Sequence, residues 1–140
     1  MSWDSYIDNL IAQSKDATGE CHASRACIIG LDGGAAWTTN LHANALQIKD
    51  DERVTIARCF KSKDFNTFMQ SGVWCEGLKY QFLRSEDDVL VLAKKKEKGS
   101  ITLQSSKTAI VITFTPDSKQ QGFTNKAVGV IADYLESMNM

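Results

Sequence analysis

Residues that could perform catalysis are present, but their spacing matches no catalytic or metal-binding motif. The histidines are His22 and His42, and the Cys21-His22 pair has no second His/Cys cluster with which to complete a metal site. Asp32-Gly33-Gly34 follows an apolar run, yet it lacks the glycine and lysine spacing of phosphate-binding loops and indicates a hairpin turn. Because no nucleophile, base and oxyanion hole come together, we expect a protein without enzymatic activity, cofactor or metal.

The cysteines leave one enzymatic alternative open. Cys21, Cys27, Cys59 and Cys75 show no CxxC spacing, and the start of the chain has neither the basic nor the apolar region of a signal peptide. We therefore expect reduced thiols in a cytosolic protein. A thiol enzyme that uses Cys75 or Cys27 as its nucleophile is a weaker hypothesis, and it requires a depressed thiol pKa.

Aromatic side chains offer a binding site instead: Trp3, Tyr6, Trp37 and Tyr134. Each one alone is more often a core residue. However, two lie at the start of an expected first helix, one beside an expected hairpin turn and one near the end of an expected last helix. If these helices pack side by side, the rings converge at one edge. Aromatic faces can stack on proline rings, while indole and hydroxyl groups donate to the free carbonyls of a polyproline II segment. The pattern therefore indicates a peptide groove.

Basic side chains form the second candidate surface. Lys94-Lys95-Lys96 and Lys98 follow a buried run, and Lys79 and Arg84 lie on an expected neighbouring strand. The lysine run alone indicates a solvated loop, but on an antiparallel sheet these residues can share a face. The net charge is −1, so any basic site is local. Such a patch suits an acidic protein partner or phosphorylated lipid headgroups better than duplex nucleic acid.

The elements that position these residues can be predicted from periodicity. Residues 1–14 form a helical stripe in which Ile7, Leu10 and Ile11 anchor the helix while Trp3 and Tyr6 stay partly open. Ser2 is the expected cap, and Asp4 suits the positive end of the helix dipole. A strand is expected over 26–31, with a returning strand over 35–39.

The rest of the chain alternates between helical and strand patterns. Two short helices are expected over 50–61 and 65–69, and strands over 79–84, 89–93, 101–104 and 108–114. A last helix is expected with Thr124 as its N-cap and an apolar stripe of Ala127, Val130, Ile131, Tyr134, Leu135 and Met138. The 140 residues therefore predict a single α+β domain over 1–140, built on an antiparallel sheet of six or seven strands.

Five stretches in this order resemble the profilin family along the whole chain. They are Ser2-Trp3-Asp4-Ser5-Tyr6, the run from Ile28 to Trp37, the Lys79-Tyr80 strand, the turn from Lys94 to Gly99, and Ala132-Asp133-Tyr134-Leu135. The resemblance implies a profilin-like α/β sandwich, with the N- and C-terminal helices side by side on one sheet face and the short helices on the other. It also implies a cytoplasmic, cytoskeletal protein that acts as a monomer and is not an enzyme.

The resemblance implies three sets of binding residues. The polyproline set is Trp3, Tyr6, Asn9, Trp37 and Tyr134, in which Asn9 helps to orient the Trp37 indole. The actin set is Phe68, Met69, Lys79, Gln81, Phe82, Arg84, Lys94, Lys96, Gly122 and Asn125. The phosphoinositide set is Lys79, Arg84, Lys94, Lys95, Lys96 and Lys126. Some family members have a histidine at the place of Tyr134 and an aromatic residue at the place of Met140, so the expected groove has one ring fewer.

The partners implied by the resemblance are monomeric actin in a 1:1 complex, proline-rich proteins such as actin elongation factors, and phosphoinositide headgroups at a membrane surface, without nucleic acid. The implied function is to regulate actin polymerisation and to speed nucleotide exchange on actin, through strain in the partner and without a catalytic residue. The alternative is a small α/β scaffold domain that binds proline-rich peptides without actin.

Overall fold

The computed structural model describes residues 3–140, so the expected cap at Ser2 lies outside the described residues. Its helices are α1 (Ser5–Gln13), α2 (Asp50–Ser62), α3 (Asn66–Ser71) and α4 (Gln121–Ser137). Its strands are β1 (Arg25–Gly30), β2 (Val73–Cys75), β3 (Leu78–Glu86), β4 (Leu90–Lys95), β5 (Gly99–Ser105) and β6 (Ala109–Pro116). Within residues 3–140 no helix combines the length and the apolar character that a membrane-spanning helix needs.

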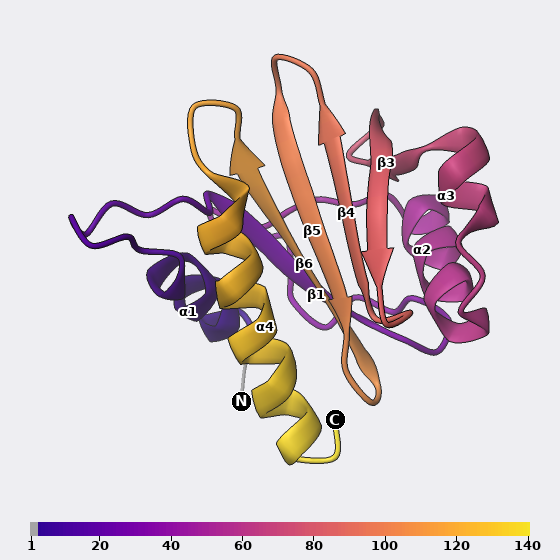
Figure 1. Cartoon of the computed structure of the whole chain (residues 1–140). Coiled ribbons are helices and arrows are strands. Elements are labelled where there is room, and N and C mark those ends of the chain that lie inside the picture. Colours follow the sequence, from indigo (N-terminus) through magenta and orange to yellow (C-terminus); the bar gives the residue numbers. More distant parts are fainter. Residues whose placement is uncertain (1–2) are drawn as a thin grey trace.

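The strands form one antiparallel sheet, in which the described residues supply six strands in the order β1-β6-β5-β4-β3-β2. Figure 1 shows α1 and α4 on one face and α2 and α3 on the other, as the family resemblance implied. The strands β3, β4 and β5 follow one another through short turns, which explains why their alternating pattern was readable in the sequence.

The returning strand expected over 35–39 is wrong. Only an isolated bridge joins Ile29 to Ala36. Beyond it, the Trp37 and Thr38 N–H groups both donate to the Ile28 carbonyl, at 2.9 and 3.3 Å, and the Ile28 N–H donates to the Thr38 hydroxyl at 3.2 Å. The loop therefore covers the outer edge of β1 through individual hydrogen bonds. One of them is accepted by the Thr38 hydroxyl, so these residues do not form the backbone hydrogen-bond ladder of a paired strand. Within residues 3–140 the sheet still has six strands, because β2 lies at the opposite edge. The sequence pattern did not predict this three-residue strand.

Apolar side chains pack on both faces of the sheet. On one face Ile110 and Ile112 of β6 meet Ile56, Phe60 and other residues of α2 and α3. On the other face Ala109 and Val111 of the same strand meet α1 and α4 through Ile7, Leu10, Val128, Ile131 and Leu135. Consecutive residues of β6 thus serve opposite cores, because side chains alternate along a strand.

The last helix begins earlier than predicted. Its N-cap is Gln120, whereas Thr124 lies inside the helix, buried, where its hydroxyl accepts a 2.5 Å hydrogen bond from Thr115. The Gln120 N–H donates to Nδ1 of His22 at 2.9 Å, and Nε2 of His22 lies 2.8 Å from the Asp16 carboxylate. A partner far away in the sequence therefore fixes where the helix begins.

The apolar stripe of α4 is narrower than predicted. Ala127, Ile131 and Leu135 are buried, but Val130, Tyr134 and Met138 remain 40–52% exposed. The exposed three are spaced four residues apart and so form a ridge along one side of the helix. Only the face that lies on the sheet and α1 is covered.

Candidate functional site

The four aromatic side chains singled out in the sequence converge into one ladder. Trp37 lies 4.8 Å from Trp3, Trp3 lies 5.0 Å from Tyr6, and Tyr6 lies 6.5 Å from Tyr134, measured between ring centroids. The rings come from the loop after β1, from α1 and the turn just before it, and from α4, so packing of the two terminal helices creates the row. We call this row the aromatic ladder.

The rings of the ladder differ in exposure. Tyr134 is 52% exposed, Trp3 and Trp37 are half-buried, and Tyr6 is only 8% exposed. The expectation that Tyr6 stays partly open is therefore wrong, because its ring lies between Trp3 and Tyr134. Burial raises the pKa of the Tyr6 phenol, and the nearby Tyr134 adds to that rise. The Tyr6 hydroxyl therefore keeps its proton to a higher pH than an ordinary tyrosine does.

Two polar contacts hold α1 against the loop that carries Trp37. The Asp4 carboxylate accepts hydrogen bonds from the Thr39 N–H at 2.7 Å and the Thr39 hydroxyl at 2.5 Å. These bonds lower the pKa of Asp4. One turn later His42 Nε2 lies 2.9 Å from the Asp8 carboxylate. Because His42 Nδ1 accepts the Asn44 N–H, Nε2 carries the proton and donates to Asp8. Sequence reasoning missed these contacts, since their partners lie 34 and 35 residues apart.

The position of the Trp37 indole depends on its neighbours in β1 and α1. A Cβ atom at Gly30 would lie 3.1 Å from the indole nitrogen, so the glycine gives the ring its room. Asn9 is exposed on α1, and within residues 3–140 no hydrogen bond joins it to Trp37. Met140 is half-buried against the core beneath α1 and α4.

Most residues of the predicted actin set line a second feature, a hollow of about 420 Å³ between α3 and the exposed ends of β3 and β4. We call it the basic cleft. Its lining from the predicted sets is Phe68, Met69, Lys79, Gln81, Phe82, Lys94, Lys95 and Lys96. Phe68 is buried and belongs to its floor, whereas Met69 is 58% exposed at its rim. The lysines, Gln81 and the exposed Gln70 are the polar groups that a partner would meet.

A β-bulge decides the place of Arg84. Gln81 pairs with Lys94, but the register shifts between Phe82 and Arg84, and Arg84 then pairs with Leu92. Paired residues share a sheet face, so Arg84 lies on the same face as Gln81 and Lys94. Strict alternation would have turned it to the other face. Arg84 is exposed and lies 3.3 Å from the Glu86 carboxylate.

The beginning of α4 borders the same open face. Asn125 accepts a 2.6 Å hydrogen bond from the Thr102 hydroxyl of β5, and Gly122 is exposed with open space around its Cα. A small hollow lined by Lys94, Ser100 and Gln121 joins the helix start to β4. Lys126 is exposed on the next turn. Lys94 lines both hollows, so the open area extends from the basic cleft to the beginning of α4.

The buried thiols contradict the thiol-enzyme hypothesis. Cys27 and Cys75 are 4% and 1% exposed. Burial raises the pKa of the Cys27 thiol to about 12 and raises that of Cys75 well above its usual value. A nucleophilic cysteine needs the opposite shift. Residues 3–140 also contain no group of three or more His, Cys, Asp or Glu side chains that could hold a metal ion.

Comparison with known proteins agrees with this architecture. The profilin family model matches residues 1–140. Profilins of Clypeaster japonicus and Suberites domuncula are 69% and 67% identical over 140 residues, with full coverage of both chains. The structure of Acanthamoeba castellanii profilin IB superposes with a TM-score of 0.79 at 25% identity, covering 99% of this chain and 100% of that one.

A further solved structure, mouse profilin IIa in complex with a double repeat from the FH1 domain of mDia1, has the same fold. It superposes with a TM-score of 0.72 at 20% identity, and the match covers both chains completely. The full-length family match and the high identity to curated profilins establish that this chain belongs to the profilin family.

Proposed function

We propose that this protein binds monomeric actin in a 1:1 complex and proline-rich segments at the same time, and so delivers actin to proline-rich elongation factors. The observation that carries this proposal is the separation of the two surfaces. The aromatic ladder is formed by residues of α1, α4 and the loops before α1 and after β1, whereas the basic cleft is lined by α3, β3 and β4. Figure 1 shows α3 and β3 toward the opposite edge of the sheet from β1 and α1.

The ladder has the dimensions and chemistry for a polyproline II segment. Its centroid separations place Trp37 and Tyr134 at most about 16 Å apart, which matches roughly five residues of polyproline II at about 3.1 Å each. The half-buried indoles and the exposed Tyr134 ring offer faces on which proline can stack. The FH1 segment bound by the mouse neighbour supports this assignment.

The actin proposal is supported by family membership and by the character of the basic cleft. The protein carries a net charge of −1, yet Lys79, Lys94, Lys95 and Lys96 gather around one hollow with Met69 at its rim. An acidic partner surface with an apolar centre would complement it. Regulation of polymerisation and of nucleotide exchange on actin would then follow from the bound partner's changed conformation.

Phosphoinositide headgroups are proposed as competitors for the same lysines. Lys94, Lys95 and Lys96 with Lys79, Arg84 and Lys126 offer the cations that phosphate groups bind. Because this set shares most of its members with the actin set, headgroup binding and actin binding should exclude each other. Family membership also supports a cytoplasmic, cytoskeleton-associated monomer.

One titration tests the proposal. Tryptophan fluorescence is followed while a proline decamer is added, and monomeric actin is then added to the saturated complex. The expected result is a fluorescence change on peptide binding, followed by actin binding without peptide release. A peptide response without any actin binding would favour the alternative, a scaffold domain that binds proline-rich peptides alone.

A further inference from the structure

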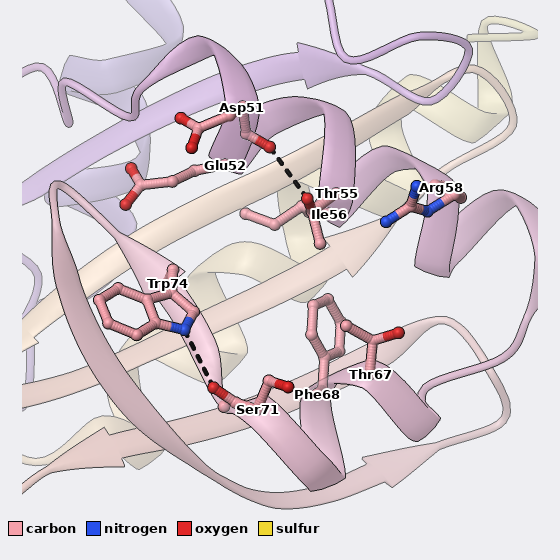
Figure 2. A pocket seen from close by; sticks show the side chains of 10 residues that line it. Asp51, Glu52, Thr55, Ile56, Arg58, Thr67, Phe68, Ser71 and Trp74 are labelled. Carbon is pink, nitrogen blue, oxygen red and sulfur yellow. Dashed lines mark hydrogen bonds between the residues drawn. The ribbon is translucent and has the colours of Figure 1, made fainter.

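A second groove lies between α2 and α3 (Figure 2), and it shares only Phe68 and Gly72 with the basic cleft. Its volume is about 340 Å³. Thr67 and Ser71 of α3 line this groove, whereas Met69 and Gln70 of the same helix line the basic cleft. We call it the α2–α3 groove. Of the residues predicted to bind actin, proline-rich segments or phosphoinositides, only Phe68 lines this groove, so the three proposed partners leave most of it unexplained.

Trp74 forms one wall of the α2–α3 groove. Its side chain is 45% exposed, and its indole N–H donates to the Ser71 carbonyl at 2.9 Å (Figure 2). The ring is therefore fixed in place and its polar atom is already satisfied, so the exposed part offers apolar surface. Ile56 and Phe68, both buried, line the same groove. A partly exposed tryptophan in an apolar groove is the kind of residue that anchors protein interfaces.

The α2 wall of the groove carries opposite charges at its two ends. Asp51, Thr55 and Arg58 lie at i, i+4 and i+7 and so share one side of the helix. Asp51 and Arg58 are exposed, and neither forms an ion pair within residues 3–140. The neighbouring Asp50, in contrast, pairs with Arg53. Seven residues of helix place the two free charges about 10 Å apart.

The distance between these two charges indicates the secondary structure of the partner segment. A helix carries side chains at i, i+3, i+4 and i+7 on one face, and its i and i+7 positions are also about 10 Å apart. Three residues of a strand span about the same distance, but side chains at i and i+3 of a strand point to opposite faces. The same-face positions of a strand, i and i+2 or i and i+4, are about 7 and 13 Å apart, so a helix matches the spacing of the two charges more closely than a strand does.

We propose that the α2–α3 groove binds an amphipathic helix of a protein partner that runs antiparallel to α2. A basic residue near the partner helix's C-terminus would meet Asp51, and an acidic residue near its N-terminus would meet Arg58. Aliphatic side chains between them would pack on Trp74. This orientation also suits the helix dipole, which favours cations at the C-terminus and anions at the N-terminus. The inference goes beyond the proposed function and does not depend on it.

The test uses two synthetic peptides of about 16 residues, rich in alanine so that they are helical. The first carries Glu, Leu, Leu and Lys at i, i+3, i+4 and i+7; the second exchanges Glu and Lys. Binding is measured by calorimetry and by the NMR shift of the Trp74 indole N–H. The variants are Trp74→Ala and the double charge reversal Asp51→Lys with Arg58→Glu. Val54→Ala is the matched control, because Val54 is 50% exposed on α2 outside the groove.

The wild-type protein should prefer the first peptide by about fivefold or more, the gain expected from a few exposed ion pairs. The double charge reversal should invert that preference, with a melting temperature lower by about a few degrees because Asp51→Lys places a cation in the first turn of α2. Trp74→Ala should weaken the preferred peptide by at least about tenfold, and Val54→Ala should change nothing. Equal binding of the two peptides, an unchanged preference in the double variant, or no binding below about 1 mM would overturn the proposal.

Discussion

Trp3→Ala is the most informative substitution in the aromatic ladder, because Trp3 lies between Trp37 and Tyr6 and contacts both rings. The ring contacts Trp37 at 4.8 Å on one side and Tyr6 at 5.0 Å on the other. Removing it breaks the row into two parts and takes away one of the faces on which proline can stack. It leaves Asp4 and Thr39 in place, so the loop after β1 remains tied to α1.

The magnitude follows from those contacts. An aromatic pair contributes about 0.5–1.5 kcal/mol beyond burial, so losing two pairs should lower the free energy of unfolding by about 1–3 kcal/mol. An interface aromatic of this kind costs about 2 kcal/mol or more of binding free energy when truncated, which is a roughly 30-fold weaker affinity. Trp3→Phe keeps a ring and should recover part of both losses.

Thermal or chemical unfolding measures the loss of stability. Calorimetric titrations measure the affinity for a proline decamer and for monomeric actin. Decamer affinity should fall about 30-fold while actin affinity stays within about twofold, because the basic cleft shares no residue with the ladder. Trp74→Ala is the matched control: it removes an exposed tryptophan far from the ladder and should leave decamer binding unchanged. Equal loss of both affinities, or unchanged decamer affinity, would refute the reasoning.

Three further predictions concern charge, pH and thiols. Lys94→Glu with Lys96→Glu should weaken actin and phosphoinositide binding, most strongly at low salt; unchanged affinity at low salt would refute the role of the basic cleft. The pKa of Asp16 is lowered to about 2, first by its hydrogen bond from Thr18 and then by His22. A lowered carboxyl pKa stabilises the fold above the unfolded value of 3.8, so this stability is lost as the pH falls from about 4 to 2. Asp16→Asn should flatten the acid limb of an unfolding series, and an unchanged limb would contradict the assignment. Iodoacetamide at pH 8 should leave Cys27 and Cys75 unmodified in the folded protein, because burial raises both pKa values above that pH; mass spectrometry showing early labelling of either would contradict this.

Elements with a strong local period were predictable from the sequence. The stripe of α1, the acidic start of α2 and the alternating strands β3 to β6 each depend on side chains within a few residues. The predictions that failed depend on contacts between residues far apart in the sequence. The loop after β1 is held by hydrogen bonds to the β1 edge rather than by strand pairing. The beginning of α4 is set by His22, 98 residues away in the sequence from Gln120.

The candidate surfaces divide in the same way. Residue types alone identified the aromatic side chains and the lysines as candidate binding residues. The family resemblance identified most of the residues that line the basic cleft. Nothing in the local pattern revealed the contacts of Asp4 and Asp8 with the loop that carries Trp37, because their partners come from a different part of the chain. The α2–α3 groove was equally hidden, since Trp74 lies on a strand of three residues.

The sequence by itself determined which side chains are available, which segments are helical or extended, and to which family the chain is similar. Only the tertiary structure decided how those side chains meet. Packing of α1 against α4 turned separate aromatics into a ladder and buried Tyr6 within it. A single bulge brought Arg84 to the face of Lys94. The physical reason is that periodicity reports the environment of one element, whereas a binding surface depends on the register and contacts between elements far apart in the chain.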